Sequence, residues 1–265
     1  MNRTRGILAA LLVVFATGCF EVEQSIELKK DLSGTASFKL GVDMEPMVII
    51  MAKVQKEMSG DKSPLTKAEI AAAKADFKKK EKKTTETTAE DPRKQAEGGL
   101  PPGVKLLDVA VAEKEFGMTT TMKFAFDKLS SLVGVKLGSK QEEGGDPTKK
   151  SVLDSPFKGL EVSETAKTIS IHTKPQNPAD KVKAETSEQG APKLDPETEK
   201  MMNDAFKNLR VAWKITAPFE VVSSNATRKE GNTLIWEYDF PTLQKLATAS
   251  PKALDDLGVS VTYKK

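Results

Sequence analysis

Apolar and polar side chains alternate in several stretches of this chain, and this alternation most limits how the chain can fold. Val22, Gln24, Ile26 and Leu28 alternate with charged or polar neighbours. Successive side chains of a strand point to opposite faces of a sheet, so this period of two predicts a half-buried strand. The turn-forming segment "KDLSG" (residues 30–34) follows and predicts a β-hairpin. Further strands are predicted at residues 36–42, 104–111, 118–126, 159–163, 168–173, 211–215, 234–240 and 259–263.

Helical spacing occurs between these strands. Behind Asp43, apolar side chains recur from Met44 to Met58 at intervals of three, four and seven residues, which predicts an amphipathic helix capped by Asp43. Antiparallel strands with helices inserted between them define the α+β class, so we expect a mainly antiparallel sheet with helices packed on one face. Further helices are predicted at residues 66–83, 129–137, 197–209 and 241–247.

Long polar segments interrupt this pattern. Residues near 84–103, 138–150 and 174–196 have low hydrophobicity and no period, so they are predicted to be flexible insertions. We expect residues 19–265 to form one α+β domain that carries these insertions.

Residues 1–18 have the layout of a bacterial secretion signal peptide. Arg3 and Arg5 precede an apolar run at residues 7–15, which is followed by small residues. A membrane-spanning helix needs roughly 20 apolar residues, and the acidic segment "EVE" (residues 21–23) arrives too soon for one. Residues 1–18 are therefore predicted to be removed from the mature protein.

Cys19 is the only cysteine of the chain and directly follows the signal. The segment "ATGC" resembles the lipobox of bacterial lipoproteins. The resemblance implies that Cys19 becomes the first mature residue and carries a diacylglycerol and palmitate-type acyl chains, which would hold the protein on the membrane. The alternative is an ordinary signal peptide cut nearby, with an incidental cysteine, although a lone free thiol is unusual in an oxidising compartment. Phe20, which is not Asp, resembles an outer-membrane sorting signal in a Gram-negative cell, on the periplasmic face or the cell surface.

The charge balance and the motif search exclude several classes of protein. Without residues 1–18, 39 basic side chains remain against 38 acidic ones, so no nucleic-acid partner is indicated. The single histidine, His172, lies in a predicted strand, and zinc sites built from His and Cys are excluded by count. No metalloprotease, hydrolase-elbow, nucleotide-binding or EF-hand motif occurs. We therefore predict no catalytic residue, metal or cofactor.

The methionine-rich helix has two interpretations. Thioether side chains adapt to irregular apolar partners, so Met44, Met47, Val48 and Met51 are candidates for an apolar ligand face. More often, residues in this pattern form the core-facing side of an amphipathic helix, which is the favoured interpretation.

Two longer segments resemble the LppM-type lipoproteins of bacteria. They are "VEQSIELKKDLSGTASFKLGV", directly after the cysteine, and "WKITAPFEVVSSNATRKEGNTLIWEYDF", near the end. The resemblance implies an α+β envelope domain and suggests binding of lipid or glycolipid. The positions that match are Asp31, Gly34, Pro218, Val221, Asn225, Gly231 and Trp236.

Together these features predict a lipid-anchored, non-enzymatic protein of the bacterial cell envelope that binds a lipid, a glycolipid or an envelope protein. A scaffold or assembly partner is the alternative. A carboxylate-dependent hydrolase is less favoured, and it stays open because its acidic residues meet only in the fold.

Overall fold

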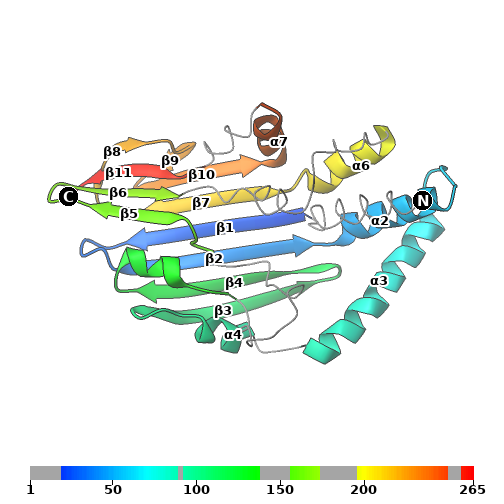
Figure 1. The fold of residues 1–265 in the computed structure, drawn as a ribbon, viewed down its shortest axis with the longest axis horizontal. Helices are drawn as coiled ribbons and strands as arrows, with labels where there is room; N and C mark the ends of the chain where they lie inside the picture. Colours follow the sequence, from blue (N-terminus) through cyan, green and yellow to red (C-terminus); the bar gives the residue numbers. More distant parts are fainter. Residues whose placement is uncertain (1–18, 89–91, 138–155, 174–195, 250–257) are drawn as a thin grey trace, which may run out of the picture.

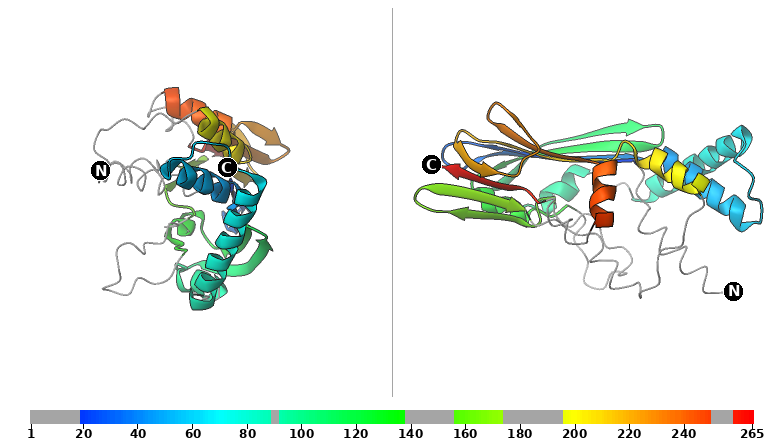
Figure 2. Two further views of the ribbon diagram at one scale, coloured as in Figure 1. Left: turned by 90° about the vertical axis from the view of Figure 1, so that its right-hand side faces the viewer. Right: turned by 90° about the horizontal axis from the view of Figure 1, so that it is seen from above.

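The computed structural model describes residues 19–88, 92–137, 156–173, 196–249 and 258–265 (Figure 1). In this part of the chain the strands form two sheets, so the predicted α+β class with mainly antiparallel strands is confirmed. The sequence suggested one sheet layer, whereas the structure has a second sheet stacked on the first (Figure 2).

The larger sheet has seven strands and contains the N-terminal strand near its centre. β1 pairs with β2 in antiparallel orientation and with β7 in parallel orientation, and the other pairs are antiparallel. The strands, in spatial order, are β3 (Val104–Lys114), β4 (Gly117–Phe126), β2 (Gly34–Asp43), β1 (Cys19–Leu28), β7 (Arg210–Thr216), β10 (Thr233–Asp239) and β9 (Arg228–Glu230).

The smaller sheet has four antiparallel strands and covers one half of the larger sheet (Figure 1). The sequence predicted no strand at β8 or β9, and the chain passes from the smaller sheet to the larger one between these two strands. The strands, in spatial order, are β5 (Leu160–Glu164), β6 (Thr168–Thr173), β11 (Ser260–Lys264) and β8 (Glu220–Ser224).

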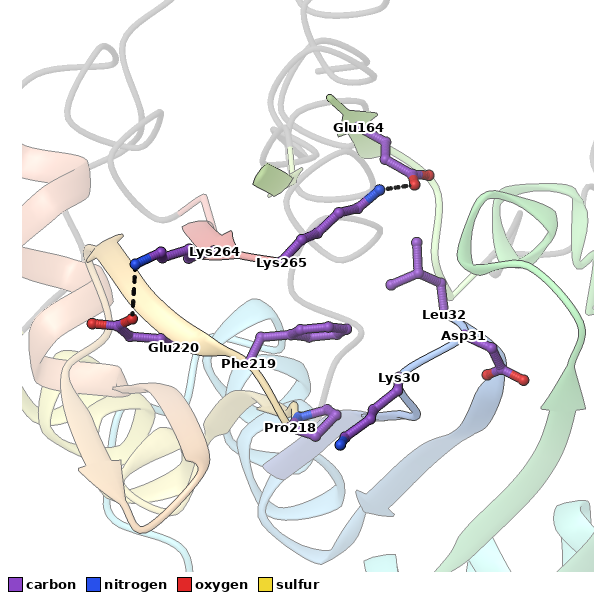
Figure 3. A pocket seen from close by; sticks show the side chains of 9 residues that line it. All are labelled: Lys30, Asp31, Leu32, Glu164, Pro218, Phe219, Glu220, Lys264 and Lys265. Atoms are coloured by element: carbon purple, nitrogen blue, oxygen red, sulfur yellow. Dashed lines mark hydrogen bonds and ion pairs between the residues drawn. The ribbon is translucent and has the colours of Figure 1, made fainter. Parts of the chain in front are cut away.

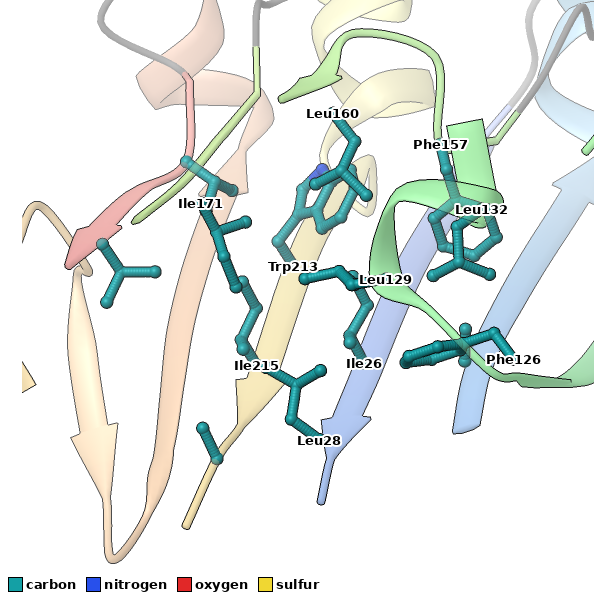
Figure 4. Close-up of a cluster of buried hydrophobic side chains, with 14 of the residues drawn as sticks. Ile26, Leu28, Phe126, Leu129, Leu132, Phe157, Leu160, Ile171, Trp213 and Ile215 are labelled. Atoms are coloured by element: carbon teal, nitrogen blue, oxygen red, sulfur yellow. The ribbon is translucent and has the colours of Figure 1, made fainter. Parts of the chain in front are cut away.

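The hydrophobic core lies between the two sheets (Figure 4). Ile26 of β1 and Ile215 of β7 are fully buried there, because the alternation places them on the inner face. The Phe157 ring packs edge-on against Phe124 and Trp213, with ring centroids 6.3 Å apart in both pairs. The short helix η1 (Leu129–Gly134) contributes Leu129 and Leu132 to the same core, in place of the longer helix predicted at residues 129–137.

The turn between β1 and β2 shows why these strands pair. The Asp31 carboxylate accepts hydrogen bonds from the backbone amide and the hydroxyl of Ser33, at 3.1 and 2.7 Å. Leu32 has a φ of 64°, a left-handed conformation that is uncommon for this residue. Gly34 is packed so tightly that an added Cβ would lie 2.0 Å from the carbonyl oxygen of Glu27.

The helices cluster mainly at one end of the larger sheet and along its edges (Figure 1). α2 packs against α3 and α6, α4 packs against β3, and α7 packs against β10. The helices are α2 (Glu45–Met58), α3 (Lys67–Thr88), α4 (Pro92–Gly98), α6 (Pro196–Phe206) and α7 (Phe240–Ala249).

The predicted insertion near residues 84–103 differs from the structure. Residues 84–88 continue α3 and residues 92–98 form α4, so much of this segment is helical. Its alanine, lysine and glutamate residues favour helix even without an apolar face. The insertion predicted at residues 138–150 lies outside the described residues, as does 174–195 of the insertion predicted at 174–196.

Candidate functional site

Cys19 is the first residue of β1, and it pairs in register with Asp43, the last residue of β2. The alternation in the sequence predicted a first strand from Val22 onward, a few residues after the cysteine. The strand instead begins at the cysteine itself, so the backbone at Cys19 is already part of the sheet. Any group on Cys19 is therefore held at one defined end of the domain.

Helix α2 starts directly beside Cys19. The carboxylate of Asp43 accepts a 3.0 Å hydrogen bond from the amide of Glu45, which satisfies one of the free amides in the first turn. The amide of Met44 donates a 2.7 Å hydrogen bond to the carbonyl of Phe116 in the turn between β3 and β4. These bonds fix the start of α2 to the end of the sheet that carries Cys19.

The four residues predicted as an apolar ligand face do not lie on one open surface. Met47 and Val48 are 3% and 6% exposed and are buried on the side of α2 that packs within the protein. Met44 is half-buried. Met51 is 50% exposed and shares the outer side of α2 with Met58, which is 63% exposed.

A different apolar surface lies on the strands at the Cys19 end. The register places Phe20, Val42 and Met118 side by side across β1, β2 and β4. They continue the inner face of the core, but Met118 and Val111 are 47% and 45% exposed. We name this surface the anchor-end face, and it consists of Phe20, Val22, Leu40, Val42, Val111, Met118 and Met122.

The smaller sheet covers the rest of the inner face but does not extend over the anchor-end face. The four-stranded sheet lies over the other half of the larger sheet, where Ile26 and Phe126 are buried (Figures 1 and 4). This surface could not be predicted from the sequence, because the alternation places its residues on the core side. The missing information was how far the second sheet extends.

The outer face of the larger sheet carries a chain of ion pairs. Glu21 pairs with Lys39 at 2.7 Å and with Arg210 at 3.1 Å, and Arg210 also pairs with Glu237. Arg228 pairs with Glu237 at 3.4 Å, so charges of alternating sign cross five strands. The hydrogen bond from Lys39 is the main cause that lowers the pKa of Glu21. These charges neutralise one another, so this face offers no concentrated charge to a ligand.

An open pocket of about 700 Å³ lies at the opposite end of the domain (Figure 3). β1 has ten residues, so this pocket is about 30 Å from Cys19. Lys264 pairs with Glu220 and Lys265 pairs with Glu164 across its walls. Its lining residues are Lys30, Asp31, Leu32, Glu164, Pro218, Phe219, Glu220, Lys264 and Lys265.

Hydrogen bonds and ion pairs shift the pKa of several carboxyl groups. A general acid at neutral pH needs a raised carboxyl pKa, as burial produces. In the described residues, every carboxyl group with a shifted pKa is shifted downward, because each accepts hydrogen bonds in a turn, a cap or an ion pair. These groups are Glu21, Asp31, Asp61, Glu69, Glu115 and Asp239.

The same part of the chain offers neither a metal-binding cluster nor a membrane-spanning helix. No group of three or more His, Cys, Asp or Glu side chains in the described ranges has a geometry that could hold a metal ion. His172 is exposed on β6. None of the described helices combines the length and the apolar character needed to cross a bilayer.

The described residues therefore define a two-sheet α+β domain whose first strand begins at a cysteine. No protein-family model and no curated protein matches the chain. A solved structure that is similar is the NMR structure of the folded domain of the Mycobacterium tuberculosis LppM protein. It has a TM-score of 0.39 and 10% sequence identity, covering 94% of this chain and 90% of that one. This is a weak resemblance in fold.

Proposed function

We propose that this chain is a lipid-anchored protein of the bacterial envelope without catalytic activity, whose anchor-end face binds a lipid, a glycolipid or an apolar segment of an envelope protein. In a Gram-negative cell we place it in the outer membrane. The observation that carries the proposal is the position of Cys19, which opens β1 in the same register that aligns Phe20, Val42 and Met118.

The position of the cysteine supports a lipid-binding role because it leaves no spacer. Acyl chains on Cys19 bring the strand ends to the membrane surface, and each buried methylene contributes about 0.8 kcal/mol to that attachment. Met118 and Val111, both about half exposed, then lie near the headgroups. Exposed apolar side chains next to a lipid surface are suited to hold an acyl chain or another apolar ligand.

The anchor is tested by mass spectrometry of the N-terminal peptide from the full chain produced in a bacterial host. We expect a diacylglycerol and a further acyl group on Cys19, and we expect the Cys19→Ser variant to leave the membrane fraction. A Cys19→Ser/Ser223→Cys variant restores a thiol on an exposed strand and should stay unmodified. An unmodified Cys19 in the full chain would refute the anchor.

The binding face is tested by native mass spectrometry of the anchored protein, purified from its own envelope in mild detergent. We expect a bound lipid or glycolipid that is lost in a Val111→Glu/Met118→Glu variant. The matched control is Val222→Glu, because Val222 is 60% exposed on β8 in the smaller sheet. Equal ligand occupancy in both variants would refute the proposed face.

A further inference from the structure

Helix α2 extends beyond the point at which the lipid is attached. β2 runs toward Cys19 and ends at Asp43, and α2 continues away from the sheet (Figures 1 and 2). With 14 residues α2 is about 21 Å long. A bilayer that holds acyl chains on Cys19 thus lies on the side toward which α2 projects.

Ion pairs and a hydrogen bond join α2 and α3 along the hairpin that these two helices form. Lys56 of α2 pairs with Glu69 of α3 at 2.9 Å, and Lys74 of α3 pairs with Glu45 of α2. The buried Lys53 donates a 3.1 Å hydrogen bond to the carbonyl of Ser63 in the connecting loop. These contacts hold the two helices and their connecting loop together as one unit, so the hairpin presents a preformed surface.

The middle of α3 is fixed to the turn between β3 and β4, which lies at the same end of the sheet as Cys19. Phe77 packs against Phe116 with ring centroids 6.5 Å apart, and the ammonium group of Lys78 lies 4.9 Å from the centre of the Phe116 ring. Lys78 also pairs with Glu115 at 2.6 Å. The position of the hairpin relative to Cys19 is therefore set by contacts at both of its helices.

The exposed surface of the hairpin matches the chemistry of a lipid surface. Met51 and Met58 are seven residues apart, which places both on one side of α2, and both are exposed. Apart from the buried Lys53, residues 45–80 hold seven lysines against five acidic side chains. Basic side chains near a membrane surface are attracted to anionic headgroups.

We infer that the α2–α3 hairpin docks on the bilayer, with Met51 and Met58 at the boundary between headgroups and acyl chains. This inference rests on the proposed lipid at Cys19. Gln55 and Glu57 lie between the two methionines in sequence, and burying their polar groups in hydrocarbon is unfavourable. The docking is therefore shallow, to a depth of about 5–10 Å.

The test uses the acylated full chain in vesicles of phosphatidylethanolamine and phosphatidylglycerol. Acylated Cys19 does not react with thiol labels, so Met58→Cys and Val222→Cys each supply one site for a nitroxide. The two native side chains are equally suitable because they are 63% and 60% exposed. We expect the label at position 58 to collide several-fold more with apolar oxygen than with a polar nickel complex, relative to the label at position 222.

The outcomes separate the inference from the function on which it rests. Mass spectrometry first establishes whether Cys19 is acylated. If it is acylated and both labels are equally accessible to the nickel complex, the docking is refuted and the anchor stands. If Cys19 carries no acyl group, the proposed anchor fails, and the docking fails with it.

Discussion

The indole Nε1 of Trp236 donates a 2.6 Å hydrogen bond to the side-chain oxygen of Asn225, and this bond joins the two sheets. Trp236 is fully buried in β10 of the larger sheet, and Asn225 follows β8 of the smaller sheet. Asn225 also donates to the carbonyl of Gly258 at 2.7 Å and accepts from the amide of Ser260 at 2.8 Å. Asn225 and Trp236, two of the five matching positions in the late segment of the sequence, thus serve the architecture of the domain.

Replacing Asn225 with Ala should lower the free energy of unfolding by about 1–3 kcal/mol, because the buried indole N–H of Trp236 loses its acceptor. Urea unfolding measures this loss. Asn232→Ala is the control, because Asn232 is exposed and, among the described residues, only its backbone carbonyl is bonded, to the amide of Ala217. In a Trp236→Phe background the Asn225→Ala loss should shrink, and an unchanged loss would show that this bond is not its cause.

Replacing Lys39 with Met should weaken the protein in a pH-dependent way. The pKa of Glu21 is lowered below its ordinary value of 4.5, first by the hydrogen bond from Lys39. A carboxyl group whose pKa is lower in the folded state stabilises the fold at every pH above its pKa in the unfolded state. This stabilisation is lost as the pH falls through the pKa of the folded state. The difference in urea midpoint between wild type and Lys39→Met should therefore be present at pH 7 and narrow below about pH 4.5.

Lys123→Met is the matched control for that experiment. Lys123 is exposed on β4, on the same outer face of the larger sheet. Its side chain forms no ion pair with any of the described residues. The difference in urea midpoint between wild type and Lys123→Met should stay constant between pH 7 and pH 3. A parallel narrowing in both variants would show that general charge loss, and not the pair with Glu21, sets the acid sensitivity.

Replacing Phe116 with Ala should loosen α3 from the sheet. Phe116 is 6% exposed and contacts Phe77, Lys74 and Lys78, so its truncation leaves a cavity and removes both cation–π contacts. We expect a loss of about 3–5 kcal/mol and faster hydrogen exchange in α3. Phe219→Ala, at the far end of the domain, should lower stability without speeding exchange in α3.

Replacing Gly34 with Ala should be much more damaging than replacing Gly41, although both lie in β2. An added Cβ at Gly34 meets the carbonyl oxygen of Glu27 at 2.0 Å, whereas at Gly41 the nearest atom is the Cβ of Glu21 at 3.4 Å. Overpacking of this kind costs about 1–3 kcal/mol, and backbone atoms cannot rotate out of the way. Thermal unfolding compares the two, and equal melting temperatures would contradict the close approach at Gly34.

Local patterns predicted most strands of the domain. The alternation at residues 22–28 and 234–240 predicted β1 and β10, because these strands have one buried and one solvated face. The helix after Asp43 was also predicted correctly as α2. β8 and β9 were not predicted, since their short segments have no clean alternation and their pairing depends on distant strands.

The candidate site was less predictable than the fold. The position of Cys19 was visible in the sequence, but its place inside the sheet depends on the pairing with Asp43. The methionine pattern predicted a helix face without showing which side is covered. Met47 is buried and Met51 is exposed, because the positions of α3 and α6 decide the buried side. The exposed Val111 and Met118 depend on the limited extent of the second sheet.

The parallel pair of β1 and β7 also dictates the order in which this domain can be completed. Glu21 of the first strand pairs with Arg210, nearly two hundred residues later in the chain. Ribosomes release the N-terminus first, so β1 and β2 exist as a hairpin while the partner for the second edge of β1 has not yet been synthesised. An unpaired strand edge is a template for wrong pairing. The strand that is synthesised first must therefore wait longest for its neighbour, which makes protection of that edge a requirement of this topology.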